Sequence, residues 1–186
     1  IGAYPYDSLE SVVTHEIALG VSGAFNSPLG AKAAFRVYGT QPGGDGFIDV
    51  HTGAGPRPEK DDFDQNYHSL RGQLLIEPSD GLDINFIADY TSREENCCTG
   101  VTTTRGRTGD IINALSPDEG VAPIARPYRR EAWSNRSTEQ DIKDKGLSAE
   151  VNWNTPWFNE ATLTSTTAYR DWGSINGLDF DFSSAD

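Results

Sequence analysis

The sequence predicts an all-β protein made of long antiparallel strands, and three observations lead to this prediction. Apolar and polar residues alternate along much of the chain, whereas helical periodicity is scarce. The alternating runs come in pairs, and a short turn rich in Pro, Gly, Asn and Asp joins the two runs of each pair. Long stretches without alternation separate the pairs. We therefore expect three hairpins, or about six strands, in an up-and-down order.

The first pair of runs covers about residues 12–39. Ile17, Leu19 and Val21 fall on one side of its first run, because successive side chains of a strand point to opposite faces. The stretch NSPLG then reverses the chain into a second run that contains Phe35.

The second pair covers about residues 67–91. Leu70 and Leu74 share a side of its first run, and Phe86 lies in its second run. The turn between them is EPSDG, in which Pro78 fixes φ and the Asp-Gly pair suits a tight reversal.

The third pair covers about residues 146–172 and turns at NTPWFNE. Two long loops, at about residues 40–65 and 92–140, link the three hairpins. The stretch 109–115 within the second loop has the pattern of one or two helical turns. Compact domains seldom carry loops of this length unless the loops have a function.

The composition limits the class of protein. The chain has 186 residues, of which 28 are Asp or Glu and 15 are Lys or Arg, so its net charge is -13. Such acidity argues against non-specific binding of nucleic acid, which needs basic patches. No run approaches the roughly 18 apolar residues of a transmembrane helix, although the alternating strands of a membrane barrel escape such a test. The chain starts without Met or a signal peptide, and we expect it to be part of a longer protein.

Two architectures fit the alternation. In a transmembrane β-barrel the apolar faces meet lipid, short turns lie on one side and long loops on the other. In a soluble sandwich the same faces pack on a second sheet, and the chain would be a β-rich surface binding module with acidic loops. The asymmetry of the connections favours the barrel. Aromatic residues near both ends of the strands also fit its two interfacial girdles: Tyr90, Trp153, Trp157, Phe158, Tyr169 and Trp172.

Three phrases in the chain carry a resemblance to a known family. The stretch SLRGQLLIEPSDGLDINFIADYTSREENCC resembles the barrel of TonB-dependent outer-membrane receptors. The phrases KGLSAEVNWN with ATLTSTTAYRDW, and VSGAFNSPLGAKAAFRVYG with GDGFIDVHTG, resemble two further hairpins of that barrel, in the same order. The phrases cover most of the predicted strands, and the long loops match poorly. The N-terminal plug domain and TonB box of the family are not visible here, and a full barrel has about 22 strands, so the resemblance is to part of the barrel.

The resemblance implies an outer-membrane transporter. Such a receptor takes up a scarce nutrient, for example a siderophore, a vitamin or a carbohydrate, and the TonB–ExbB–ExbD complex energises it through the plug. The long loops and the polar faces of the strands would then meet the nutrient. Strand parity predicts these lumen-lining residues: Arg36, Arg71, Asp89, Glu150 and Arg170.

The adjacent Cys97 and Cys98 are the sharpest local feature of the long loops. A disulfide within the loop fits an oxidising compartment, while free or inter-chain thiols and a soft-metal site remain alternatives. Asp179 and Asp181 could hold a cation, but a solvated segment is the simpler interpretation. No spacing typical of a catalytic, cofactor or metal site occurs elsewhere, so we expect neither an enzyme nor a bound cofactor.

Overall fold

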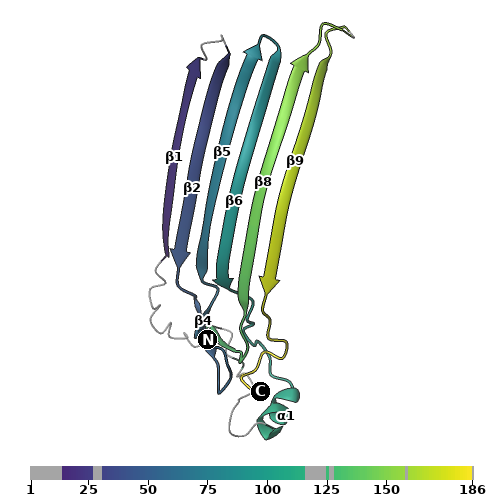
Figure 1. The fold of residues 1–186 in the computed structure, drawn as a ribbon. Coiled ribbons are helices and arrows are strands. Elements are labelled where there is room, and N and C mark those ends of the chain that lie inside the picture. Colours follow the sequence, from purple (N-terminus) through teal and green to yellow (C-terminus); the bar gives the residue numbers. More distant parts are fainter. Residues whose placement is uncertain (1–13, 27–30, 116–124, 126–127, 158, 186) are drawn as a thin grey trace, which may run out of the picture.

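The computed structural model describes residues 14–26, 31–115, 125, 128–157 and 159–185. Its main feature is a six-stranded antiparallel sheet, in which each strand pairs with its neighbours in the order of the chain (Figure 1). Strands β1 and β9 form its two edges. The bounds of the long strands are Thr14–Asn26 for β1, Lys32–Gly44 for β2, Gln65–Ser79 for β5, Leu82–Asn96 for β6, Glu139–Asn154 for β8 and Thr162–Asn176 for β9.

The predicted antiparallel hairpins are therefore present. In the hairpin of β5 and β6, Gly81 has a φ of 81°, a left-handed conformation that suits Gly because it has no Cβ. The pairing shifts by a bulge between Ile76 and Ser79, just before this turn. The start of the first predicted hairpin, at residues 12–13, and residues 27–30 of its turn lie outside the described residues.

The strands extend further than the alternation predicted. Strands β2 and β6 continue into residues 40–44 and 92–96, and β8 begins at Glu139 rather than at about residue 146. These extensions are mostly polar or Gly-rich, so they lack the alternation that marks a half-buried strand. Backbone pairing with the neighbouring strand continues through them nonetheless.

The two long connections fold together at one end of the sheet (Figure 1). We call residues 45–64 and 97–138 the first and second excursion. They contain a small sheet in the order β4-β3-β7, made of Ile48–His51 for β3, Asp61–Asp62 for β4 and Glu131–Trp133 for β7. The helical turns expected near residues 109–115 are present as α1, Thr108–Leu115.

The apolar core of the described residues lies in this small sheet and not on the long strands. Ile48, Val50 and Ala132 are buried together, and Val101 packs against them. The long strands form a single curved layer, and the small sheet lies beyond their ends (Figure 1). In the part of the chain that the structure describes, no second sheet covers the apolar side of the six-stranded sheet.

Candidate functional site

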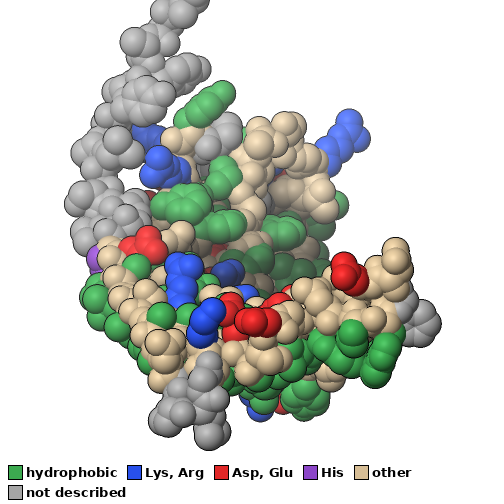
Figure 2. Space-filling model, turned by 90° about the horizontal axis from the view of Figure 1, so that it is seen from above, with side chains coloured by type: hydrophobic (Ala, Val, Ile, Leu, Met, Phe, Trp, Pro, Cys, Tyr) green, Lys and Arg blue, Asp and Glu red, His purple; other side chains and the backbone are tan. Residues whose placement is uncertain are grey.

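The six-stranded sheet has one polar and one apolar face. Directly paired residues of an antiparallel sheet point to the same side, so the register assigns each side chain to a face. Figure 2 looks along the strands from the turn end. It shows charged side chains on the concave side of the curved wall and hydrophobic side chains along its convex side.

All five residues predicted to line a lumen lie on this concave face. Arg71 pairs with Asp89, Asp89 with Gly146, and Gly146 with Arg170, so they form one row across four strands. Arg36 occupies the same face, because it pairs with Gln73, which is two residues from Arg71. Glu150 does so because it is four residues from Gly146 on the same strand. The parity prediction therefore brings these residues together on one side of the sheet.

An ionic bridge crosses β8 on this face. The Arg170 Nη2 atom lies 3.0 Å from Asp89 Oδ2 and 3.3 Å from Asp89 Oδ1. Arg170 also pairs with Asp144. Gly146 stands between the two partners, and a Cβ there would come within 3.1 Å of Arg170 Nη2 and 3.2 Å of Asp89 Oδ1. Because Gly146 has no side chain, the Arg170 side chain can cross β8 at this position and reach Asp89.

A second polar network lies closer to the turns. The Asn152 side-chain amide donates to Asp83 Oδ2 at 3.0 Å and to Glu150 Oε1 at 3.2 Å. Thr164 donates to Asn152 Oδ1 at 2.7 Å, so the network joins β6, β8 and β9. Hydrogen bonds between side chains on adjacent strands stabilise a sheet.

The β2 and β5 part of the concave face is different. The Arg36 guanidinium lies over the ring of Tyr38, 5.3 Å from its centroid. Arg71 is directly opposite Tyr38 across the two strands. Among the described residues, neither Arg36 nor Arg71 forms an ion pair.

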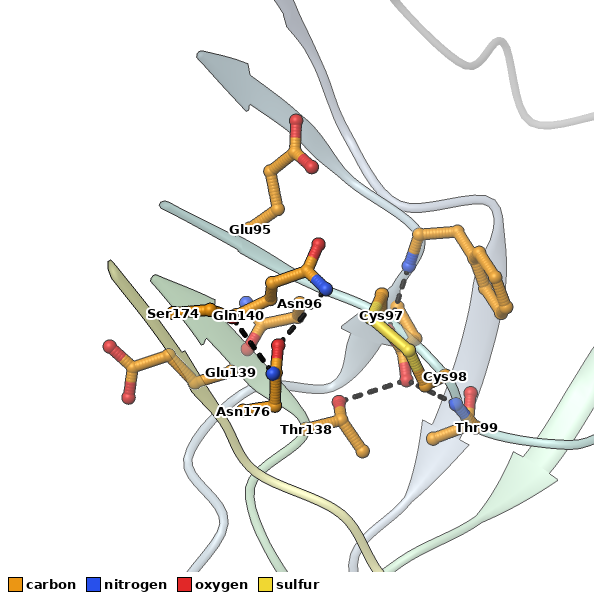
Figure 3. Close-up of a disulfide and its surroundings, with 12 residues drawn as sticks. Glu95, Asn96, Cys97, Cys98, Thr99, Thr138, Glu139, Gln140, Ser174 and Asn176 are labelled. Carbon is orange, nitrogen blue, oxygen red and sulfur yellow. Dashed lines mark hydrogen bonds between the residues drawn. A yellow bond between two sulfur atoms is a disulfide. The ribbon is translucent and has the colours of Figure 1, made fainter. Parts of the chain in front are cut away.

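Cys97 and Cys98 form a disulfide at the start of the second excursion, immediately after β6 (Figure 3). This agrees with the intra-loop disulfide expected from the sequence. Cys98 has a φ of 83°, which is uncommon for a residue other than Gly. The backbone N–H of Cys97 donates to the Thr138 carbonyl at 3.0 Å, which ties the segment to the residues before β8.

A buried ion pair within the first excursion, which no sequence pattern predicted, is hydrogen-bonded to the second excursion. The Arg57 Nη2 atom lies 3.5 Å from Asp62 Oδ2, and both side chains have no exposed area. Asp62 Oδ2 also accepts hydrogen bonds from the Thr99 N–H at 3.1 Å and the Thr138 hydroxyl at 3.0 Å. Arg57 in turn donates to Thr138 Oγ1 at 2.8 Å and to the Asp61 carbonyl at 3.0 Å.

We call Arg57, Asp62 and Thr138 the excursion lock, because they come from both excursions and hydrogen-bond to one another. Arg57 also donates to the Glu59 carbonyl, at 3.0 Å. In sequence, this arginine looks like any other charged residue of a polar loop, and only the fold brings it to Asp62. No local signal could have found the lock.

Of the two aspartates considered for a cation site or a solvated strand start, Asp179 is buried and Asp181 is exposed. The Oδ2 atom of Asp179 accepts the backbone N–H of Asn135 at 2.9 Å. Burial acts to raise the pKa of Asp179, but hydrogen bonds from Ser134, Asp181 and the backbone outweigh it and hold this pKa below its usual value. Burial raises the pKa of Asp181, and its hydrogen bond with Asp179 raises it further. Asp179 anchors the segment after β9 to the second excursion, while Asp181 accepts a hydrogen bond from the Ser183 N–H within that segment.

A surface hollow of about 300 Å³ lies where the first excursion meets β1, β2, β5 and β6. His15 and three carboxylates, those of Asp45, Asp61 and Asp64, contribute to its lining. Burial raises the pKa of Asp64, and the nearby carboxylate of Asp61 also acts to raise it. Within the described residues, no group of three or more His, Cys, Asp or Glu side chains is arranged to hold a metal ion.

No helix in the described part of the chain is both long enough and apolar enough to cross a membrane. Comparisons with protein-family models, with characterised proteins and with solved structures gave no match. The residues and their geometry therefore carry the functional argument.

Proposed function

We propose that this chain is part of the barrel wall of a TonB-dependent outer-membrane receptor, which takes up a scarce nutrient. One observation carries the proposal. The six-stranded sheet is a single layer that exposes an apolar face on its convex side and holds a charged, hydrogen-bonded face on its concave side. A barrel wall between lipid and an aqueous lumen needs this distribution.

The apolar face is too large and too exposed for a water-facing surface. Its large side chains keep a high exposed fraction, for example 75% for Leu19, 62% for Leu147 and 66% for Tyr169. Soluble monomers seldom leave large contiguous apolar areas open to water. Lipid is the partner that this face fits, because it would cover the whole face without a second protein layer.

The apolar band also runs obliquely across the sheet. One row of paired residues leads from Leu19 in β1 through Leu70 and Tyr90 to Lys145 and Asp171. The row is thus apolar at one edge of the sheet and charged at the other. A band parallel to a membrane would cross the register in this way if the strands were tilted, as barrel strands are.

The ends of the strands support an orientation for the wall. Short turns lie at one end and both excursions at the other (Figure 1). In the proposed receptor the turns face the periplasm and the excursions face the outside of the cell. The nutrient would meet the excursions and the upper concave wall, and the TonB–ExbB–ExbD complex would drive its release inwards through the plug.

Lipid contact can be tested with a pair of tryptophan variants. Leu147 lies on the convex face, and Ser148 is the next residue, on the concave face. Leu147→Trp and Ser148→Trp would each be made in the protein as its source cells produce it, and reconstituted in vesicles with and without brominated acyl chains. We expect bromine to quench the added fluorescence of Leu147→Trp much more than that of Ser148→Trp.

The native tryptophans are common to both variants, so the difference between the variants isolates the added ring. Equal quenching of the two variants would refute a lipid-facing convex side. A protein that stays in the soluble fraction, with Leu147→Trp shielded from every aqueous quencher, would instead establish the sandwich.

A further inference from the structure

We propose that Arg36, Tyr38 and Arg71 form a binding site for a ring-bearing oxyanion, such as an aromatic carboxylate or phosphate, on the concave face of the wall. The inference rests on the proposed function, because it names the chemical class of ligand that the lumen would take. Three features of the site support a ligand of this class: its two guanidinium groups, its aromatic ring and its open side.

The register places the three side chains next to one another. Tyr38 is directly opposite Arg71, and Arg36 is directly opposite Gln73 on the same pair of strands. Arg36 and Arg71 are therefore diagonal neighbours on one face, a separation that long side chains bridge easily. A guanidinium presents its N–H donors as a planar fork that matches a carboxylate or phosphate.

The positive charge of this site has no partner in the described part of the chain. The nearest carboxylate in the row is that of Asp89, directly opposite Arg71 on β6. Both of its oxygens instead lie within 3.3 Å of Arg170 Nη2, on the other side of β8. Arg93, on the same face, is by contrast 3.5 Å from Glu95. Arg36 and Arg71 are thus the two arginines on the concave side of the described strands that form no ion pair.

The aromatic ring gives the site a flat surface. Arg36 lies over Tyr38, and the ring is only partly buried. Gly20 is opposite Tyr38 on β1, so no side chain stands beside the ring on that strand. A planar ring of a ligand can therefore pack along Tyr38, while its anionic group accepts hydrogen bonds from the two arginines.

Benzoate and benzamide are matched probes, because they differ in charge but hardly in shape. Binding to the full-length protein in detergent would be followed by line broadening of the probe in a proton NMR titration, with phenyl phosphate as a second anion. We expect benzoate and phenyl phosphate to bind and benzamide to bind at least about tenfold more weakly, because charged hydrogen bonds are the strong ones.

Substitution separates this site from general charge attraction. Arg36→Gln and Arg71→Gln should each weaken benzoate binding about tenfold or more. Arg93→Gln removes the same charge from the same face, but from a residue already paired with Glu95, and should change the affinity less than about twofold.

Three results would overturn the inference: no binding of either anion, benzamide binding as tightly as benzoate, or an equal loss from Arg93→Gln. The lipid-quenching pair, measured on the same preparation, separates the two proposals. Lipid contact without anion binding refutes the ligand site alone. Anion binding without lipid contact refutes the receptor and, with it, the role of the site in transport.

Discussion

The excursion lock allows a prediction whose size follows from the structure. Arg57→Met leaves the Asp62 carboxylate buried without its cation, and Asp62→Asn leaves the guanidinium of Arg57 buried without its anion. Loss of one partner of a buried ion pair costs about 3–5 kcal/mol, because the remaining charge is desolvated and uncompensated. The double variant removes both charges, so neither is left buried alone, although the Glu59 and Asp61 carbonyls lose the Arg57 donor. We therefore expect it to be less destabilised than the sum of the single variants, by about 1–3 kcal/mol.

Hydrogen–deuterium exchange can measure this locally. The amide of Phe47 donates to the Asp62 carbonyl at 3.0 Å, and the amide of Val50 donates to the Lys60 carbonyl at 2.7 Å, so both report opening of the first excursion. A loss of 3–5 kcal/mol corresponds to exchange faster by about two to three and a half orders of magnitude. Amides at the centre of β6 should be unchanged. Strictly additive effects in the double variant, or faster exchange in β6 to the same degree, would refute a local lock.

Three further predictions concern the wall and the hollow. Leu74→Arg on the convex face should cost about 2–4 kcal/mol and still allow membrane insertion, whereas Thr166→Arg, opposite Glu150 on the concave face, should be nearly neutral. A Leu74→Arg protein that never folds would indicate a sandwich core. Gly146→Ala should displace the ionic bridge over β8, and so lower the temperature at which half of the protein migrates as the unfolded band on a gel. Gly173→Ala is the control, because a Cβ there meets nothing within 4 Å. Equal midpoint temperatures for the two variants would count against the bridge. Burial raises the pKa of Asp64 above 3.8, so the folded state binds this proton more tightly and its stability rises as the pH falls through that pKa. Asp64→Asn should therefore be more stable than the wild type at neutral pH, with an advantage that shrinks towards pH 4 in urea unfolding, and a constant difference would contradict this.

Strand parity is the part of the structure that the sequence could predict. Alternation fixes which side chains share a face, and this is why Arg71, Asp89 and Arg170 could be grouped before any register was known. It could not fix which strand positions stand opposite each other. That Gly146 falls between Asp89 and Arg170 follows from the register alone.

The excursions could not be predicted, because their order comes from contacts that are distant in sequence. Strand β3 pairs in parallel with β7, and their residues lie some eighty positions apart. Each strand is too short to show a pattern: β3 has four residues and β7 has three. Among the features of the excursions, the adjacent cysteines and the helical turns of α1 carried a local signal in the sequence.

The charges of the concave face divide the wall into two parts with different roles. From β6 to β9, Arg170 is neutralised by Asp89 and Asp144, so substitutions there should change mainly the stability of the sheet. On β2 and β5, Arg36 and Arg71 stabilise no described carboxylate, and their removal relieves the repulsion between two neighbouring cations. Arg71→Gln should therefore leave the wall as stable as before, or more so, while it weakens anion binding. A loss of stability from Arg71→Gln equal to that from Arg170→Gln would mean that both halves of the wall serve only to hold the strands together.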